Sequence, residues 1–225
     1  MTHPAESAPC SPGVIPGPKL RLILAATGAS GSIFAAEMLR ALDADARVAK
    51  VDFIPSEASL RVFAEEMQLS GRNALAEKLL GHASTSPSKI IQHAEADIGA
   101  SIASGSYAVD SMVVIPCTTG CLAQVAHGIS DTLIERAADV CLKESRKLVL
   151  AVRDAPFNQI HLKNMLRAQT AGAVIFPIIP SFYHRPKTLD DLVTQFCCRV
   201  LAQLGLEQAD QFRWRGLGAG EGSGQ

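Results

Sequence analysis

A Gly/Ser-rich turn at residues 27–31, Thr-Gly-Ala-Ser-Gly, has a composition that suits the binding of an anion. It follows an apolar run at residues 20–26 and precedes apolar residues at helical spacing. Gly28 and Gly31 allow the backbone to turn tightly and approach a ligand, and N–H groups at a helix start bind phosphate. A plain strand-to-helix turn is the alternative interpretation. Because the GxGxxG spacing of dinucleotide-binding turns is missing, the motif favours a mononucleotide phosphate.

Polar residues also follow two later apolar runs. A second small-residue turn, Pro-Cys-Thr-Thr-Gly-Cys, occupies residues 116–121, and Arg153 and Asp154 come directly after the run at residues 147–152. If the runs are parallel strands, their carboxyl ends share one edge of a sheet, and these groups would meet there. A strand end that carries both a cation and a carboxylate suggests a functional site, although a surface ion pair is the alternative.

Three further polar residues have two interpretations each. Ser56 follows another apolar run, where its spacing favours a helix N-cap over a ligand contact. Arg136 and Lys143 are seven residues apart and therefore share one face of a predicted helix. A solvated charged face is their ordinary explanation, because Asp139 and Glu144 alternate with them.

A proline-rich segment at residues 177–186 carries two aromatic side chains, Phe182 and Tyr183. Its prolines restrict the backbone and therefore predict a rigid loop. Rigid aromatic rings beside a phosphate site suggest a planar or allylic ligand.

The elements that must position these residues alternate between strand and helix. This alternation predicts an α/β fold, a parallel sheet with helices on both faces and the ligand site at the carboxyl edge of its strands. The predicted strands are residues 20–26, 50–55, 111–116, 147–152 and 173–177. The predicted helices are residues 32–43, 57–67, 72–80, 119–127, 131–145, 158–171 and 188–204.

Composition divides the 225 residues into three parts. Proline-rich residues 1–18 predict a disordered leader, residues 19–215 a single α/β domain, and glycine-rich residues 216–225 a flexible tail. The net charge of −1 is spread evenly, which predicts no nucleic-acid partner and no polybasic membrane anchor. Without a signal pattern or an apolar run of spanning length, we expect a cytoplasmic protein that acts on small molecules.

The cysteines predict reduced thiols rather than a disulfide framework. Cys117 and Cys121 lack a second Cys/His pair at zinc-ligand spacing, so we expect no metal. The other cysteines are Cys10, Cys141, Cys197 and Cys198.

Five segments of the chain have the order and spacing of motifs in one known family. They are residues 27–31, 97–106, 134–144, 161–166 and 180–186. On these segments the chain, from about residue 20 to about residue 215, resembles the flavin prenyltransferases of the UbiX type. They belong to the FMN-binding, homo-oligomeric, Rossmann-like flavoproteins. The resemblance implies a flavodoxin-like three-layer sandwich.

Members of that family join a dimethylallyl group to reduced FMN, making the prenylated FMN that UbiD-type decarboxylases use. The resemblance implies the same transferase activity here, with dimethylallyl phosphate as donor, FMN as cofactor, no metal, and a homo-oligomer that is a dodecamer. It implies FMN contacts at Gly28, Ala29, Ser30, Ser56, Thr118, Thr119, Gly120, Cys121 and Arg153. It implies catalytic roles for Asp154, Lys143 and Arg136, and prenyl-donor contacts at Ser104, Tyr183 and Arg199.

Two positions depart from the family pattern. Asp154 stands where the family has a glutamate that is proposed to assist protonation and phosphate departure, and it is shorter by one methylene, about 1.5 Å. The turn at residues 118–121 also differs from the usual family residues. The alternatives are therefore an FMN-binding paralogue with altered or lost prenyl transfer, and a flavin-dependent cysteine-type decarboxylase. The decarboxylase relatives carry Pro-Ala-Ser-Ala-Asn-Thr where this chain has residues 116–121.

Overall fold

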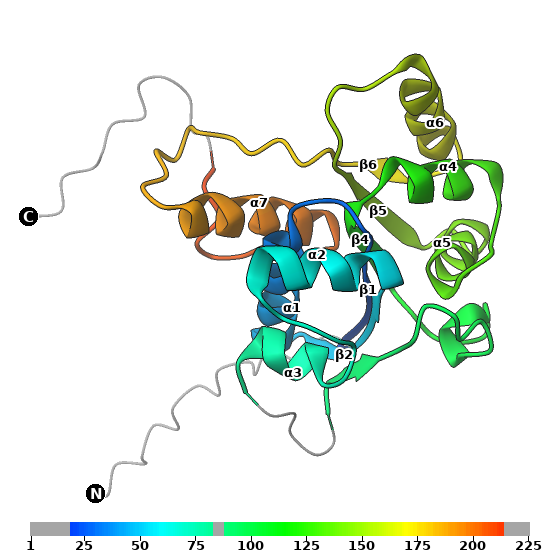
Figure 1. Ribbon diagram of the computed structural model, residues 1–225, viewed down its shortest axis with the longest axis horizontal. Coiled ribbons are helices and arrows are strands. Elements are labelled where there is room, and N and C mark those ends of the chain that lie inside the picture. Colours follow the sequence, from blue (N-terminus) through cyan, green and yellow to red (C-terminus); the bar gives the residue numbers. More distant parts are fainter. Residues whose placement is uncertain (1–18, 83–87, 214–225) are drawn as a thin grey trace, which may run out of the picture.

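A computed structural model describes residues 19–82 and 88–213, which are organised around one parallel sheet (Figure 1). Its strands are β1 (Leu20–Ala26), β2 (Val48–Pro55), β3 (Ile90–Gln92), β4 (Ser111–Cys117), β5 (Lys147–Val152) and β6 (Val174–Ile175). The helices are α1 (Ser32–Ala44), α2 (Glu57–Met67), α3 (Leu75–Leu80), α4 (Thr119–His127), α5 (Leu133–Lys143), α6 (Gln159–Thr170) and α7 (Leu189–Gln203), with a 3-10 turn η1 (Ser101–Ala103).

The strand order is β3-β2-β1-β4-β5-β6, and every neighbouring pair is parallel. The chain builds outward from β1 to β3, then returns to place β4 on the other side of β1. The point between β1 and β4 is therefore the topological switch of the sheet, and in open parallel sheets ligands bind beyond the carboxyl ends of the strands there.

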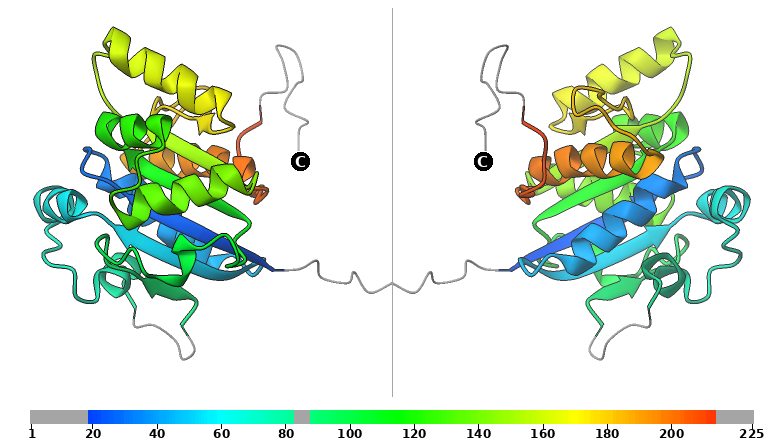
Figure 2. Two further views of the ribbon diagram at one scale, coloured as in Figure 1. Left: turned by 90° about the vertical axis from the view of Figure 1, so that its right-hand side faces the viewer. Right: turned by 90° about the vertical axis from the view of Figure 1, so that its left-hand side faces the viewer.

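Helices cover both faces of the sheet (Figure 2). Side chains alternate along β1, so that Leu22 and Leu24 pack on the α1 and α7 side, whereas Ile23 and Ala25 pack on the α4 and α5 side. Because both faces are covered, β1 reads as a continuous apolar run instead of an alternating one. The expected flavodoxin-like three-layer arrangement is confirmed.

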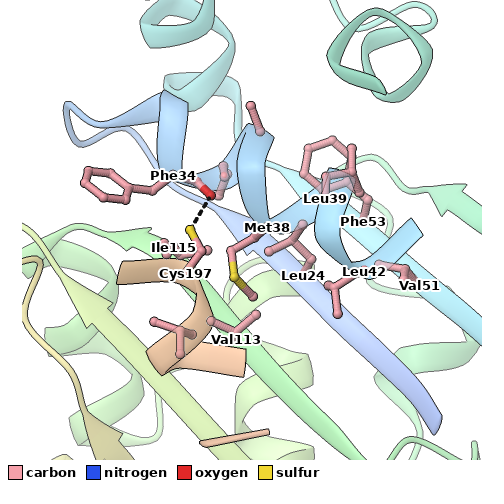
Figure 3. Close-up of a cluster of buried hydrophobic side chains, with 14 of the residues drawn as sticks. Leu24, Phe34, Met38, Leu39, Leu42, Val51, Phe53, Val113, Ile115 and Cys197 are labelled. Atoms are coloured by element: carbon pink, nitrogen blue, oxygen red, sulfur yellow. Dashed lines mark hydrogen bonds between the residues drawn. The ribbon is translucent and has the colours of Figure 1, made fainter. Parts of the chain in front are cut away.

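The core on the α1 face joins the first helix to the last one (Figure 3). Phe34 of α1 meets Phe196 of α7 edge to face, with ring centroids 5.0 Å apart. The Cys197 thiol donates a hydrogen bond to the Phe34 carbonyl at 3.7 Å. Burial raises the pKa of Cys197 well above its ordinary value, so this thiol stays protonated. This packing fixes the middle of α7 against the start of α1.

The five predicted strands and seven predicted helices are present; β1, β5, α2 and α4 have the predicted bounds, and the bounds of the others are shifted. β2 begins earlier than expected, at Val48, β6 is reduced to Val174–Ile175, and α3 begins at Leu75. The sequence interpretation missed β3 and η1, because a run of three residues is too short to show periodicity. The expected leader, residues 1–18, and tail, residues 216–225, lie outside the described residues.

Within residues 19–82 and 88–213, none of the helices is long and apolar enough to cross a membrane.

Candidate functional site

The loops that follow β1, β2 and β4 are tied together at the carboxyl edge of the sheet. The Thr118 N–H donates to the Thr27 hydroxyl at 2.8 Å, and that hydroxyl donates to the Pro116 carbonyl, also at 2.8 Å. The Ser56 N–H donates to the Ala26 carbonyl at 2.9 Å. Thr27 therefore uses its hydroxyl as both acceptor and donor, and the two small-residue turns form one surface.

Glycine is required at two positions of the first turn. A Cβ atom on Gly28 would lie 2.4 Å from the Cβ of Ala58, so only glycine lets this turn approach the start of α2. Gly31 has a φ of 111°, in the left-handed region that glycine adopts without strain. Between them, Ala29 is buried and Ser30 is exposed. The close approach accounts for the small residues that made the turn conspicuous in the sequence.

The start of α1 binds a carboxylate that the sequence interpretation missed. Glu66, on α2, accepts hydrogen bonds from the Ser32 N–H at 2.8 Å, the Ser32 hydroxyl at 2.7 Å and the Gly31 N–H at 3.0 Å. Burial raises the pKa of Glu66, but hydrogen bonds from Ser30, Ser32 and Gly31 outweigh burial and hold that pKa below its ordinary value. The α1 N-terminus therefore favours a negative charge.

No local spacing could have identified Glu66, because its contact depends on how α2 packs beside α1. Its carboxylate lies in a hollow of about 470 Å³, lined also by Ser30, Met67 and Leu189. Leu189 is the first residue of α7, so this hollow connects the first turn with the end of the proline-rich loop.

Two further helices begin at the same edge with side-chain caps. The Ser56 hydroxyl accepts from the Ser59 N–H at 2.9 Å at the start of α2. The Thr118 hydroxyl accepts from the Cys121 N–H at 3.1 Å at the start of α4. The capping interpretation of Ser56 is thus confirmed. Three helix N-termini, those of α1, α2 and α4, converge on one edge, which makes it favourable for a phosphate.

Arg153 and Asp154 lie at the end of β5, beside the second turn. The Arg153 N–H donates to the Cys117 carbonyl at 3.0 Å. One Asp154 oxygen accepts from the Thr119 hydroxyl at 3.2 Å, and the other accepts from the Ala155 N–H at 2.9 Å. Both side chains line a hollow of about 350 Å³ between the β5 and β6 loops. In the described part of the chain Arg153 has no ion pair, so the surface-pair alternative finds no support.

The proline-rich loop brings Tyr183 next to Arg199. Both residues line a hollow of about 270 Å³ together with His184 and Gln195. The Arg199 guanidinium lies 5.4 Å from the centroid of the Phe176 ring, at the start of the loop. Tyr183 and Arg199 are exposed, so an aromatic ring and a cation lie at the surface here.

Ser104, Arg136 and Lys143 form a second group, on the outer side of α5. The Arg136 side chain donates to the Ala103 carbonyl at 3.1 Å and forms an ion pair with Asp139 at 2.9 Å. The Lys143 ammonium is 3.8 Å from a carboxylate oxygen of the adjacent glutamate. The alternating charges expected on this helix face are thus paired. Arg136 and Lys143 thus lie on α5 and Ser104 at the end of η1, whereas the two turns and Arg153 follow strands of the sheet.

Cys117 and Cys121 are buried at the second turn, and neither is in a disulfide. A hydrogen bond from Cys117, together with burial, raises the pKa of Cys121 well above its ordinary value. Metal binding needs the thiolate form. Over the described ranges, no cluster of three or more His, Cys, Asp or Glu side chains could hold a metal. Cys141, Cys197 and Cys198 are also free thiols, and Cys10 lies outside the described residues.

Known proteins of the same architecture carry closely related sequences. The chain matches the family described as Flavoprotein over residues 16–197. It is 42% identical over 190 residues to the flavin prenyltransferase UbiX of Alkalihalophilus pseudofirmus, which covers 84% of this chain and 92% of that relative.

Two solved structures have the same fold at a TM-score of 0.78. One is AnUbiX (PadA1) in complex with FMN and dimethylallyl pyrophosphate, 35% identical, covering 88% of this chain and 99% of that one. The other is the dodecameric FMN-dependent Ubix-like decarboxylase from Escherichia coli O157:H7, 38% identical, covering 88% and 100%. Since both the family match and these relatives span most of the sequence, the chain belongs to the flavoprotein family, in the group of the UbiX flavin prenyltransferases.

Proposed function

We propose that this protein is a flavin prenyltransferase, which transfers a dimethylallyl group from dimethylallyl phosphate to reduced FMN. The observation that carries the proposal is the convergence of three helix N-termini and two linked small-residue turns on one sheet edge, next to the Arg153 cation. The Gly31 and Ser32 N–H groups at that edge bind the Glu66 carboxylate, so these donors suit an anion, and the FMN phosphate would take the place of that carboxylate.

The turn residues would hold the cofactor from two sides. Gly28, Ala29 and Ser30 approach from the end of β1, and Ser56 approaches from the end of β2. Residues Thr118, Thr119, Gly120 and Cys121 approach from the end of β4, and Arg153 adds a positive charge from the end of β5. Reduced FMN, when bound, supplies the electron-rich ring that accepts the allyl group.

Cations and an aromatic ring would assist departure of the donor phosphate. Negative charge grows on the phosphate oxygens as the carbon–oxygen bond breaks, and Arg136, Lys143 and Arg199 would stabilise it. The Tyr183 ring would stabilise the cationic allyl carbon through its face and exclude water from it. Ser104 would donate a hydrogen bond to the phosphate. No metal is needed when these side chains supply the positive charge.

Asp154 would hold the proton that the leaving phosphate takes up. Its carboxylate already accepts hydrogen bonds from Thr119 and Ala155, which fix its orientation at the mouth of the 350 Å³ hollow. Because it is shorter than the glutamate that the family resemblance implies, its reach to the donor is reduced. Displacements of about 1 Å cost on the order of a hundredfold in rate when geometry is critical. We therefore expect slow transfer.

An assembly of several copies would bring the two groups of site residues together. Arg136 and Lys143 are on α5 and Ser104 follows η1, whereas the proposed FMN contacts are on the turns after β1, β2 and β4 and on Arg153. Exposed apolar side chains on α6 and on the proline-rich loop provide a surface for such contacts, namely Ile160, Leu162, Leu166, Ile179 and Phe182. We propose a homo-oligomer, and a dodecamer in particular, since the related Escherichia coli protein is dodecameric.

The proposed reaction has a product with a further use and takes place in a particular compartment. Prenylated FMN would pass to a UbiD-type decarboxylase, because the modified flavin is a cofactor rather than an end product. The reaction would take place in the cytoplasm, within one α/β domain at residues 19–215.

The decisive experiment is a mass spectrum of flavin extracted after reaction. Purified protein is incubated anaerobically with reduced FMN and either dimethylallyl phosphate or the diphosphate, and a reaction without donor is the control. A flavin heavier by one dimethylallyl group is expected. Bound but unmodified flavin would instead favour the paralogue without transfer, to which the short Asp154 side chain points. A cysteine-type decarboxylase is not favoured, because residues 116–121 read Pro-Cys-Thr-Thr-Gly-Cys where those decarboxylases carry Pro-Ala-Ser-Ala-Asn-Thr.

A further inference from the structure

A fully buried carboxylate on β2 is the centre of a polar cluster away from the carboxyl edge. Asp52 is 0% exposed, and its two oxygens accept hydrogen bonds from His93 at 2.7 Å and from the Tyr107 hydroxyl at 2.9 Å. The Lys50 ammonium donates to the same hydroxyl at 2.5 Å. Arg21 and Lys50 both lie over the Tyr107 ring, 5.7 Å and 5.1 Å from its centroid.

These contacts keep the Asp52 carboxylate ionised. Burial alone raises the pKa of Asp52, but the hydrogen bonds from His93 and Tyr107 and the positive charge of Lys50 outweigh it, so that the pKa lies below its ordinary value. A buried charge that loses one of its partners is strongly unfavourable, which makes the Tyr107 hydroxyl hard to replace.

Tyr107 belongs to the segment that carries Ser104. The Tyr107 N–H donates to the Ser104 carbonyl at 3.2 Å, and the hydroxyls of Ser104 and Ser106 are hydrogen-bonded at 2.8 Å. Arg146, at the start of β5, donates to the carbonyls of Gly105 at 2.7 Å and Tyr107 at 2.9 Å. Residues 104–107 lack regular secondary structure, so these side chains fix their place on the sheet.

We propose that Tyr107, anchored by Asp52, is a positioning residue that holds Ser104 in place for the prenyl donor. The inference rests on the proposed function, in which Ser104 contacts the donor phosphate. Only two residues separate Tyr107 from Ser104, and the turn between them is closed by a hydrogen bond, so a shift of the Tyr107 ring moves the serine. The residues proposed to hold FMN lie on other loops, so the effect is specific to the donor.

The test is Tyr107→Phe, which removes one hydroxyl and keeps the ring. KM for dimethylallyl phosphate should rise about tenfold, as expected when the displaced Ser104 loses its proposed hydrogen bond to the charged donor phosphate. The FMN Kd should stay the same, and kcat should change less than KM. In the Ser104→Ala background, Tyr107→Phe should add little, because both changes remove the same contact. Hydrogen exchange of residues 100–110 should become faster in Tyr107→Phe.

Lys89→Met is the matched control. Lys89 donates to the carbonyls of Asp43 and Asp45 at 2.7 Å and 2.8 Å, at the end of α1, on the opposite edge of the sheet from the turns. This variant should lose thermal stability with donor KM unchanged.

Wild-type protein that transfers no prenyl group would contradict the proposed function, and this inference with it, before any variant is compared. With an active wild type, a Tyr107→Phe variant of lower thermal stability and unchanged KM would overturn the inference alone. Additive effects of Tyr107→Phe and Ser104→Ala would also overturn it, as would unchanged hydrogen exchange over residues 100–110.

Discussion

Replacing Glu66 by glutamine should destabilise the protein, because the carboxylate accepts from three donors at the start of α1: the Gly31 N–H, the Ser32 N–H and the Ser32 hydroxyl. An amide presents one oxygen to these donors and turns its own NH₂ group toward the others. Hydrogen bonds to a charged group contribute about 1.5–3 kcal/mol, against about 0.5–1.5 kcal/mol for a neutral pair. Solvent screens the exposed Glu66 side chain, so we expect a loss of about 1 kcal/mol.

The loss should depend on pH in a defined direction. The folded-state pKa of Glu66 is lowered from the ordinary 4.5, so the ionised form stabilises the fold above pH 4.5. As the pH falls through the lower folded-state value, this contribution disappears. The difference between wild type and Glu66→Gln should therefore be complete at neutral pH and shrink in acid.

Thermal unfolding of the ligand-free protein measures the effect. A change of 1 kcal/mol lowers Tm by about 2–4 °C in a chain of this size. Glu65→Gln is the matched control, since Glu65 is the exposed neighbour on the same helix and should leave Tm unchanged. Equal Tm values for wild type and Glu66→Gln at neutral pH would refute the reasoning, as would an equal loss in Glu65→Gln.

Three further predictions concern the proposed reaction and assembly. Asp154→Glu should raise the single-turnover rate of prenyl transfer, because the longer side chain restores the reach of the carboxyl group. Asp154→Asn should lower that rate without changing FMN affinity. If the Glu variant is no faster and the Asn variant no slower than wild type, Asp154 is not the acid. Ser30→Trp should abolish FMN binding, followed by flavin absorbance. Its loss of Tm should not exceed that of Glu66→Gln, because Ser30 is exposed and its contact is a hydrogen bond to Glu66. Native flavin occupancy would refute this. Leu166→Glu should reduce the mass seen by light scattering, because Leu166 is 65% exposed on α6, while Lys163→Glu leaves the mass unchanged; a monomeric wild type would argue against the assembly.

The parts of the site that the sequence could predict are those encoded by local chemistry. The turn around Gly28 is recognisable because a close approach to α2 demands glycine, and such a demand is visible in residue type alone. Arg153 and Asp154 could be placed because they directly follow a buried apolar strand. The pairing of Arg136 with Asp139 follows from helical spacing.

What the sequence did not reveal depends on contacts between distant segments. Glu66 reaches the start of α1 only because α2 packs beside α1. Glu66 and Ser32 are 34 residues apart in the sequence. In the Asp52 cluster, Asp52 of β2 contacts Tyr107, which is 55 residues further along the chain. An aspartate inside an apolar strand does not indicate which residues it will contact. β3 has only three residues, and pairing with β2 rather than propensity makes it a strand.

The hydroxyl of Thr27 has a consequence for the speed and entropy of flavin binding. Because it joins the loops after β1 and β4 with two 2.8 Å hydrogen bonds, the two turns hold each other in place through protein contacts alone. A ligand that enters a preorganised cradle does not have to order flexible loops, so less of its interaction free energy is lost. Without this hydroxyl, as in Thr27→Val, the two turns would become ordered only when the ligand binds. Binding would then be slower and would carry the entropy cost of ordering the turns.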